Sequence, residues 1–368
     1  MKFNIDRDEL FAGLATLINV VEKKQTLPVL SNLFFELQNG VLTIIGTDLE
    51  VQIIYKISEN LEIEEEGKIT IPARKLFDIC RNSASGASIN FSINGQKCDL
   101  KISDSKFSLS YLSADEFPAV FNVASENVVR LNSTSLNNVI SKTVFAMAVQ
   151  DVRYYLNGLY LEFCSNKIRA VATDGHRLAL SDAYFTNSIE NDFSLLVPRK
   201  GIIELQRLLS KDGKELVLEI GSNHIKVQLD NICFITKLID GKFPDYEKAI
   251  PVINEKKLTI PKDLFKNALL RAAILSNEKF KGVTLDIKDN VLIINSHNPD
   301  QEEAIEKFAV SYTANKVEAG YNVNYLVEAV NAIEEDDVLI GFHDTTSSCL
   351  IQSPASSDDR YVVMPLRI

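Results

Sequence analysis

Short motifs in this sequence recur at a fixed spacing. The repeated pairs, each separated by 126 residues, are Thr47-Asp48 with Thr173-Asp174, Ile71-Pro72 with Val197-Pro198, and Phe117-Pro118 with Phe243-Pro244. Three landmarks that share one offset indicate a duplicated unit, because unrelated segments would not keep a common spacing.

A third and more divergent copy follows the first two. Residues Leu285–Ile294 match Leu161–Ala170 and Phe35–Ile44 in the order of apolar and polar positions. Three units of about 123 residues account for the 368 residues of the chain, a length that suits two or three domains. We expect repeat boundaries at 1–122, 123–252 and 253–368.

Each copy begins with a predicted helix. Asp6 and Glu9 form a capping-box pattern, and Ser133 and Pro261 mark the corresponding starts in the other copies. The apolar face of the first helix is Leu10, Phe11, Leu14, Leu17 and Ile18, which have helical spacing. Second helices are predicted near 74–81, 200–210 and 325–333.

Alternating apolar segments around short polar turns predict antiparallel strands between these helices. The turns after the first helices are Asn39-Gly40, Ser165-Asn166 and Asp289-Asn290, residues that tolerate the positive φ of tight hairpins. Later hairpins turn at Asn94-Gly95 and near Gly221-Ser222. Two helices and several antiparallel strands in each copy are typical of an α+β fold.

The composition is that of a well-packed chain without a membrane span. Apolar residues make up 46% and charged residues 24%, and no apolar run approaches the 18 residues of a membrane helix. The start, MKFNIDRDEL, becomes acidic where a signal peptide would become apolar, so we expect a cytoplasmic protein with no membrane partner. The five cysteines are far apart and lack metal-ligand spacing, which predicts buried reduced thiols, no metal and no cofactor.

Charge is distributed unevenly over the predicted elements. The net charge of −11 argues at first against nucleic acid, but the helix from Pro198 to Lys211 carries four basic residues and one acid. We expect the acids to collect in strand connections, for example Glu62 and Glu64–Glu66. A basic helix face is more often solvated than phosphate-facing, and the second helix of the third copy is acidic, with Glu328, Glu334 and Glu335.

Two segments allow both a structural and a functional interpretation. Asp174 and His176 could form a catalytic or metal-binding pair, but a turn capped by Asp174 and permitted by Gly175 explains the same residues better. The sequence has no ATP-binding or hydrolase motif, and His224, His297 and His343 are given no role. The apolar C-terminal segment from Tyr361 is expected to be a core strand, or else to line a groove open to a partner.

The chain resembles the bacterial DNA polymerase III β subunits, the β sliding clamps, over its whole length. The motifs that carry this resemblance are Thr26-Leu27-Pro28, the segment Gln150–Gly158, the segment Ala172–Leu178, Phe243-Pro244-Asp245-Tyr246, and Met364-Pro365-Leu366-Arg367. The resemblance implies a DNA clamp fold of three tandem repeats, each with two helices packed on antiparallel sheet, in a ring-shaped dimer. It also implies a processivity factor that encircles DNA and is not an enzyme, with no catalytic residue.

The resemblance implies sequence-independent, topological binding of double-stranded DNA along helices that line the ring. Weak phosphate attraction suits sliding, so net acidity with basic helices fits this function. The implied DNA-contacting residues are Lys23, Lys24, Arg74, Arg81, Gln150, Tyr154, Tyr155, Arg199, Lys200 and Lys266. The acidic second helix of the third copy speaks against a uniformly positive lining.

The resemblance further implies a pocket for short clamp-binding peptides of the DNA polymerase III α subunit, the clamp loader δ subunit, and other polymerases and repair proteins. The implied pocket residues are Leu156, Thr173, Gly175, His176, Arg177, Leu178, Pro244, Lys248, Ala249, Ser348, Val362, Met364, Pro365, Leu366 and Arg367. Many relatives have an Arg and a larger aliphatic residue in place of Lys248-Ala249, which implies a shallower wall here.

The homodimer contact is expected between an edge strand near Phe107 in the first repeat and Ile274 and Leu275 in the third. The alternative to a clamp is a repeat scaffold that binds peptides but does not encircle DNA. An Asp174/His176 hydrolase is a further alternative that no sequence feature favours.

Overall fold

The structure is a computed structural model that describes residues 1–21, 27–186, 188–189, 191–209, 212–253, 255–343 and 348–366. The chain divides into two compact units. The first unit combines Met1–Ser133 with Ile203–Leu238, and the second combines Thr134–Ile202 with Ile239–Ile368. The repeat boundaries expected from the sequence remain a prediction.

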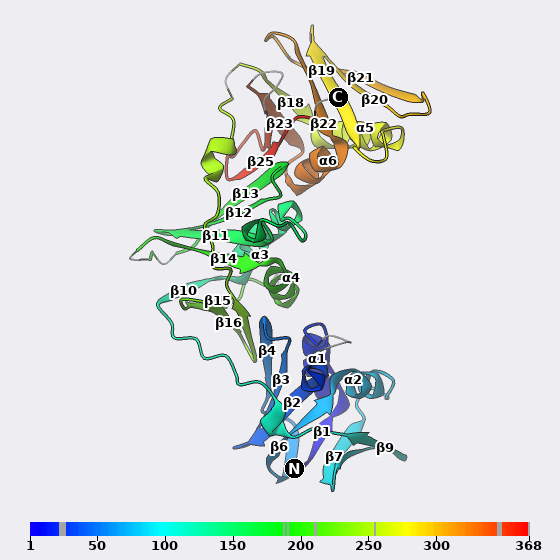
Figure 1. Cartoon of the computed structure of the whole chain (residues 1–368), viewed down its shortest axis with the longest axis vertical. Coiled ribbons are helices and arrows are strands. Elements are labelled where there is room, and N and C mark those ends of the chain that lie inside the picture. Colours follow the sequence, from blue (N-terminus) through cyan, green and yellow to red (C-terminus); the bar gives the residue numbers. More distant parts are fainter. Residues whose placement is uncertain are drawn as a thin grey trace. The chain divides into compact units, whose positions relative to one another are not determined.

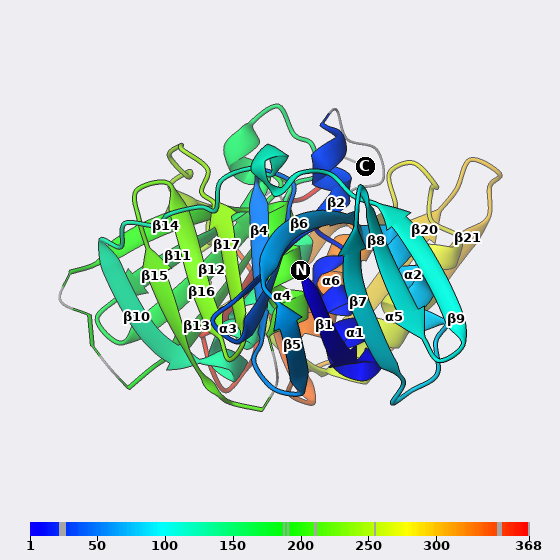
Figure 2. The same cartoon turned by 90° about the horizontal axis from the view of Figure 1, so that it is seen from below.

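The first unit contains two helices of the first repeat and two antiparallel sheets (Figure 1). Its elements are β1 (Lys2–Asp6), α1 (Arg7–Leu17), β2 (Asn32–Gln38), β3 (Val41–Thr47), β4 (Val51–Ile57), β5 (Leu61–Glu65), β6 (Gly67–Pro72), α2 (Ala73–Arg81), β7 (Ser88–Asn94), β8 (Lys97–Ile102), β9 (Ser105–Ser110), β10 (Asn127–Asn132), β15 (Glu215–Ile220), β16 (His224–Leu229) and β17 (Ile232–Lys237). The strand orders are β5-β1-β7-β8-β9 and β10-β15-β16-β17-β4-β3-β2-β6. In Figure 2, β4 continues the row of strands formed by β15, β16 and β17.

The second unit is built in the same way from the rest of the second repeat and the third. Its elements are α3 (Ser133–Ser141), β11 (Gly158–Cys164), β12 (Lys167–Thr173), β13 (Arg177–Tyr184), β14 (Phe193–Pro198), the start of α4 (Arg199–Leu208), β18 (Lys257–Pro261), α5 (Lys262–Ile274), β19 (Gly282–Lys288), β20 (Val291–His297), β21 (Glu303–Ala309), β22 (Val317–Asn322), α6 (Val323–Ala332), β23 (Asp337–Phe342), β24 (Cys349–Gln352) and β25 (Asp359–Val363). The strand orders are β14-β11-β12-β13-β25-β24-β23-β18 and β21-β20-β19-β22. The predicted α+β class and its helices are confirmed.

Successive repeats are joined by the same antiparallel strand pair. In the first unit β4 pairs with β17, and in the second unit β13 pairs with β25. Strands β4, β13 and β21 begin at Val51, Arg177 and Glu303, so the spacing of 126 residues found in the sequence is also the spacing of these strands. The third repeat has β21 where the first two have β4 and β13, and the first repeat has β9 where the other two have β17 and β25. Both β21 and β9 lie at the edge of their sheets.

Local chemistry explains why the elements begin and turn where they do. The Asp6 side chain caps α1 by accepting a hydrogen bond from the backbone N of Asp8 at 2.7 Å. The turn residues Asn39, Ser165 and Asp289 have φ of 52°, 51° and 50°, as predicted from their tolerance of this region.

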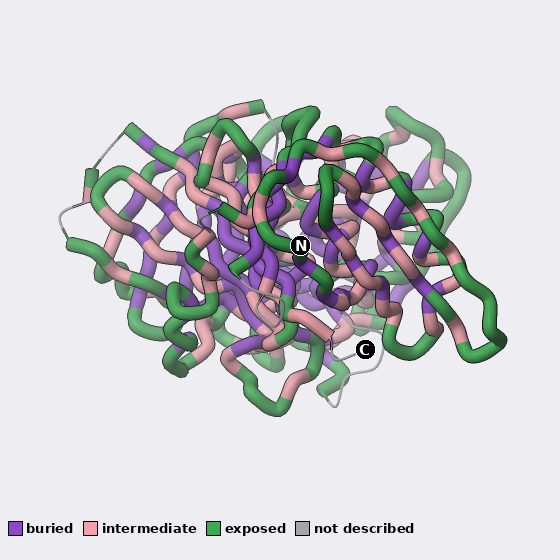
Figure 3. The backbone as a smooth tube through the Cα atoms, turned by 90° about the horizontal axis from the view of Figure 1, so that it is seen from above, coloured by how far each residue is buried: buried purple, intermediate pink, exposed green. Residues whose placement is uncertain are grey.

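The core follows the apolar periodicity of the sequence. In Figure 3 buried backbone is concentrated in the strands, whereas the connections are mostly exposed. Leu10, Leu14 and Leu17 of α1 are fully buried, as expected of one helical face. Phe11, which was predicted on the same face, is only half-buried and stacks on Phe77 of α2 at 5.3 Å between ring centroids.

The acids near residue 62 correct one expectation. Glu62, Glu64 and Glu65 lie in strand β5 rather than in a connection, although Glu66 does follow it. Strand β5 pairs with β1, and Glu62 accepts a hydrogen bond from the Asn4 side chain at 3.0 Å. The acidic side chains are compatible with a strand because β5 is an exposed sheet edge.

Most of the cysteines are buried, as the sequence predicts, but Cys164 is half-buried. All five cysteines are unpaired thiols, four of them buried, and burial raises the pKa of Cys80 to about 12. Among the described residues, no helix combines the length and apolar character needed to cross a membrane. The same part of the chain contains no cluster of three or more His, Cys, Asp or Glu arranged to hold a metal ion.

Candidate functional site

The segment Thr173–Arg177 forms a tight turn between β12 and β13. The Thr173 hydroxyl donates to the Arg177 carbonyl oxygen at 2.6 Å and accepts from the Gly175 backbone N at 3.1 Å. The Asp174 carboxylate accepts from the backbone N of His176 at 2.9 Å and of Arg177 at 3.0 Å. Asp174 therefore closes the turn, which is the structural interpretation of this motif rather than the catalytic one.

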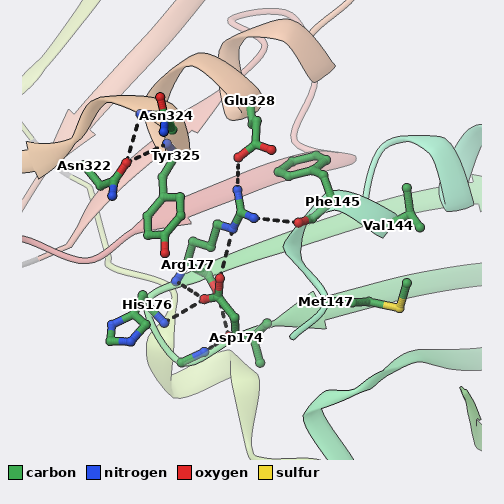
Figure 4. A network of polar contacts seen from close by, with 12 residues as sticks. Val144, Phe145, Met147, Asp174, His176, Arg177, Asn322, Asn324, Tyr325 and Glu328 are labelled. Atoms are coloured by element: carbon green, nitrogen blue, oxygen red, sulfur yellow. Dashed lines mark hydrogen bonds and ion pairs between the residues drawn. The ribbon is translucent and has the colours of Figure 1, made fainter. Parts of the chain in front are cut away.

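Arg177 connects this turn to two other elements (Figure 4). Its guanidinium donates to Glu328 of α6 and to the Phe145 carbonyl oxygen of the short 3-10 helix η3 (Val144–Ala146), at 2.6 Å in the second case. It also lies over the Tyr325 ring, 4.4 Å from the centroid, and burial raises the pKa of Tyr325. Glu328 thus serves an ion pair inside the second unit, and it is the one acid of α6, because Glu334 and Glu335, which were expected on this helix, follow its end at Ala332.

The C-terminal segment is both a core strand and a surface of the site. β25 lies between β13 and β24, so its backbone is paired on both sides. Beyond it, the Met364 backbone N donates to the His176 carbonyl oxygen at 2.9 Å, and that of Leu366 donates to Gly320 at 2.8 Å. These bonds hold the segment extended beside the 173–177 turn, where Met364 remains about half exposed (48%).

A cavity of about 1030 Å³ lies beside this turn and the C-terminal segment, within the second unit. The predicted residues that line it are Leu156, Thr173, Gly175, Arg177, Leu178, Pro244, Lys248, Ala249, Ser348, Val362, Met364, Pro365 and Leu366. Buried Leu156, Leu178 and Val362 belong to one apolar cluster that forms its floor. His176 is not a lining residue, although its carbonyl holds the C-terminal segment, and Arg367 lies outside the described residues.

Several lining residues were missed by the sequence interpretation. They are Arg153, Tyr155, Asp245, Tyr246, Ile250, Pro251, Val252 and His343. Arg153 and Tyr155 lie next to Leu156, and Asp245 and Tyr246 next to Pro244, so neighbouring motif residues were a usable signal. His343, to which the sequence interpretation gave no role, also lies at the cavity, and only the fold brings it there.

The charges at the cavity are paired with neighbouring opposite charges. Arg153 bonds to Asp151 at 2.8 and 3.0 Å and donates to the Asp174 carbonyl oxygen at 3.3 Å. The hydrogen bonds from Arg153 lower the pKa of Asp151 to about 2. Lys248 pairs with Asp245 at 2.7 Å. The cavity therefore has an apolar floor and edges whose charges are paired with opposite charges. This combination suits apolar side chains carried on a peptide backbone.

The predicted DNA-contacting residues of the first unit lie on α2. Arg74 and Arg81 are exposed; Arg74 donates to the Val21 carbonyl oxygen at 3.4 Å, and Arg81 pairs with Asp78 at 2.8 Å. The predicted residues Lys23 and Lys24 lie outside the described residues.

The predicted DNA-contacting residues of the second unit fall into two groups. Gln150 (φ 57°) and Tyr154 (56% exposed) lie on one exposed loop, whereas Tyr155 is half-buried at the cavity. Arg199 donates to the Met147 carbonyl oxygen at 3.2 Å and so supports the start of this loop. The remaining predicted residues, Lys200 on α4 and Lys266 on α5, are half-buried.

Two of the three residues expected at a subunit contact are exposed. Phe107 is on edge strand β9 and is 36% exposed. Ile274, the last residue of α5, is 77% exposed, and Leu275 after it is half-buried.

The repeated α+β units, with paired helices and sheets joined through β4–β17 and β13–β25, define a three-domain clamp fold. Comparison with known proteins agrees: residues 1–121, 130–245 and 247–367 match the N-terminal, central and C-terminal domains of the DNA polymerase III beta subunit. The beta sliding clamps of Pseudomonas putida and Escherichia coli K12 are each 41% identical over 368 residues, covering all of both chains.

Solved structures give the same result. A sliding clamp from Pseudomonas aeruginosa bound to griselimycin has a TM-score of 0.96 at 40% identity, with full coverage of both chains. The Caulobacter crescentus clamp, solved with polyethylene glycol at a putative beta-motif tethering region, has a TM-score of 0.95 at 33% identity, covering 100% of this chain and 99% of that one. The chain belongs to the family of bacterial DNA polymerase III β subunits. Its function is that of a DNA sliding clamp in replication.

Proposed function

We propose that two copies of this chain join head to tail into a ring that encircles double-stranded DNA and acts without catalysis in the cytoplasm. In this proposal the cavity of the second unit receives short peptides of the DNA polymerase III α subunit, the clamp loader δ subunit, and other polymerases and repair proteins. The observation that carries the ring is the repeated strand pairing between successive repeats.

The repeat spacing supplies the argument for the dimer. Strands β4 and β13 each pair with the last strand of the following repeat, β17 and β25. By the same rule, β21 of one subunit would pair with β9 of the other, and both lie at sheet edges that can accept a strand. Ile274, Leu275 and Phe107 would then be covered, together with exposed Ile305 of β21. Two such contacts close a symmetric dimer.

A closed ring explains why the chain is acidic overall. Topological linkage needs no base contacts, and only weak attraction to phosphate is compatible with sliding. This attraction to phosphate would come from basic residues, namely Arg74, Arg81, Lys200 and Lys266 of the helices together with Lys23 and Lys24. Gln150 and Tyr154 would contact DNA from their exposed loop, and Arg199 would support that loop.

The cavity has the properties of a peptide site. Its apolar floor and compensated edges suit apolar anchor residues, and the predicted residues that line it, including Lys248 and Ala249, would contact the peptide. Ligands bound to the related clamps of P. aeruginosa and C. crescentus, griselimycin and polyethylene glycol, support a binding site in the family.

Retention on circular DNA tests the ring. The protein is loaded onto a nicked plasmid with a bacterial clamp loader and ATP, the complex is isolated at high salt, and the circle is then cut once. Loss of the protein on cutting is expected, because a distant cut leaves phosphate contacts unchanged and high salt already screens them. Equal retention before and after the cut, or a monomeric mass in solution, would contradict the ring and favour a scaffold.

A pair of surface variants separates the subunit contact from general effects. Ile274→Lys is expected to abolish retention and to shift the solution mass to a monomer, because a charge would be buried at the contact. Val128→Lys is the matched control: Val128 is also exposed, at 55%, but lies on β10, which belongs to a different sheet from β9 and from β21. Equal behaviour of the two variants would refute this contact.

Deletion of Met364–Ile368 tests the cavity. Peptide binding is expected to weaken strongly while the dimer stays intact, because β25 ends at Val363. Unchanged peptide affinity would refute the assignment of the cavity.

A further inference from the structure

One wall of the cavity is a chain segment rather than a sheet or helix. Residues 244–253, which we call the 244–253 linker, supply lining residues from Pro244 to Val252. Apart from the short 3-10 helix η5 (Tyr246–Ala249), the linker has no regular structure, and Lys248, Ala249 and Val252 are exposed. Such a wall needs fixed points if the cavity is to keep its width.

The first fixed point is the Tyr246 hydroxyl. Tyr246 is 7% exposed, and its hydroxyl donates to Glu162 and accepts from Arg169 at 3.3 Å. Arg169 is held in turn by two bonds to Asp182 at 2.6 and 2.8 Å. Burial raises the pKa of Tyr246, so the hydroxyl keeps its proton and remains a donor at neutral pH.

The sheet positions this acceptor group. Glu162 of β11 is the cross-strand partner of Arg169 of β12, and Arg169 is the partner of Asp182 of β13. The three side chains therefore form one row across three neighbouring strands. The row is anchored in the sheet, and Tyr246 attaches the linker to it.

The second fixed point is a contact of Ile253 with Gly341 of β23. A Cβ atom on Gly341 would lie 2.5 Å from Cγ2 and 2.7 Å from Cγ1 of Ile253, so the glycine provides the space that the isoleucine fills. Ile253 also packs against the apolar cluster that forms the cavity floor. The linker is thus fixed on both sides of the lining residues 248–252.

We propose that Tyr246, bonded to Glu162 and Arg169, and Ile253, seated on Gly341, are positioning residues that hold the cavity at the width required by its peptide. This inference rests on the proposed peptide site. The two anchors pre-organise the wall, so loss of either lowers the fraction of molecules with a binding-competent cavity and weakens the apparent affinity in proportion.

Calorimetric titration with griselimycin tests the first anchor on the full-length dimer. Tyr246→Phe keeps the ring and removes the hydroxyl, and we expect an affinity loss of about tenfold. Tyr184→Phe is the matched control, because it removes a hydroxyl bonded to Asp358 at 3.3 Å on the same sheet but away from the lining residues. The control is expected to bind as the wild type does.

Two further measurements separate positioning from general destabilisation. Glu162→Gln keeps a hydrogen-bond acceptor for Tyr246 and should retain the affinity for griselimycin. Glu162→Ala should weaken this affinity, and the double variant with Tyr246→Phe should bind no more weakly than Tyr246→Phe alone. Amide exchange should accelerate in residues 247–252 of Tyr246→Phe and remain unchanged in β11–β13.

A variant of the second anchor keeps the test independent of how Tyr246→Phe folds. Gly341→Ala would push Ile253 outward and should also weaken griselimycin binding. Wild-type affinity in both Tyr246→Phe and Gly341→Ala, while the wild type binds, would overturn the inference and leave the proposed site intact. Absence of binding by the wild type would instead remove the proposed site.

Discussion

The first two repeats build the same turn and use it differently. In the first repeat the Thr47 hydroxyl donates to the Val51 carbonyl oxygen at 2.8 Å, and Asp48 accepts from the Val51 backbone N at 2.7 Å. In the second repeat Thr173 and Asp174 make the corresponding bonds to Arg177 at 2.6 and 3.0 Å. The turn itself is therefore an inherited structural element, and its role in a site must come from the residues around it.

Three positions differ between these turns: Leu49, Glu50 and Val51 in the first are Gly175, His176 and Arg177 in the second. Val51 is fully buried, whereas Arg177 connects the turn to α6 and η3. The residue with positive φ is Leu49 at 75° in the first turn and Gly175 at 87° in the second. A Cβ atom on Gly175 would lie 3.0 Å from the Arg153 guanidinium, so the glycine leaves room for this side chain at the cavity rim. The comparison indicates that Gly175 and Arg177 distinguish the turn at the cavity from the corresponding turn of the first repeat.

The largest effect is expected from removing Arg177. Arg177→Ala should lower the free energy of unfolding of the second unit by about 3 kcal/mol, because one buried side chain serves Asp174, Glu328 and a backbone carbonyl. Val51→Ala in the first unit should cost about 2 kcal/mol through lost apolar burial alone. Urea denaturation followed by circular dichroism measures both.

The two variants should also differ in where the structure loosens. Amide exchange in α6 is expected to accelerate only in Arg177→Ala, since Arg177 contacts Glu328 and Tyr325 of that helix. Unchanged exchange in α6 would mean that Arg177 is an ordinary turn residue like Val51.

A smaller effect is expected at the residue with positive φ. Gly175→Ala should destabilise by about 1–2 kcal/mol, because an alanine is strained at this φ and crowds Arg153. Leu49→Gly should change stability by less than about 1 kcal/mol, since relief of backbone strain offsets the lost side-chain contact. Equal losses of stability for the two variants, measured by thermal unfolding, would show that the positive φ restricts both turns to the same degree.

The parts of the fold that were predicted from sequence depend on local chemistry. The helix start at Asp6 and the turns at Asn39 and Asp289 follow from capping and positive φ, which a few neighbouring residues determine. Strand β5 was missed, because its acidic residues form a strand only beside β1. Pairing with a strand far away in sequence leaves no pattern in the segment itself.

The candidate site also contains residues that were predicted from the sequence and residues that were not. Residues inside recognisable motifs, such as Leu178 and Pro244, were predicted and line the cavity. His343 and the link from Arg177 to Glu328 were not predicted, because they depend on how the third repeat packs on the second. Resemblance to a family predicts which positions of the chain form the site. The ion pairs that these residues make are seen only in the three-dimensional structure.

The smallest expected effect is electrostatic and lies at the rim of the second turn. Arg153 and Asp151 have no counterpart in the first repeat, where the equivalent residues are Leu27 and Gln25. The pKa of Asp151 is lowered to about 2, chiefly by hydrogen bonds from Arg153. A folded-state pKa below the unfolded value means that the pair contributes fully above about pH 4 and is lost as the pH falls towards 2.

Carboxyl NMR titration checks this assignment directly. In Arg153→Gln the midpoint of Asp151 should rise towards its ordinary value of about 4. Asp8 in the first unit is the internal control, because its lowered pKa depends on hydrogen bonds from Ser85 and Arg7 and should not respond. If Asp151 of the wild type titrated near pH 4, Arg153 would not be paired with Asp151 at the cavity rim, and the first two repeats would not differ in this respect.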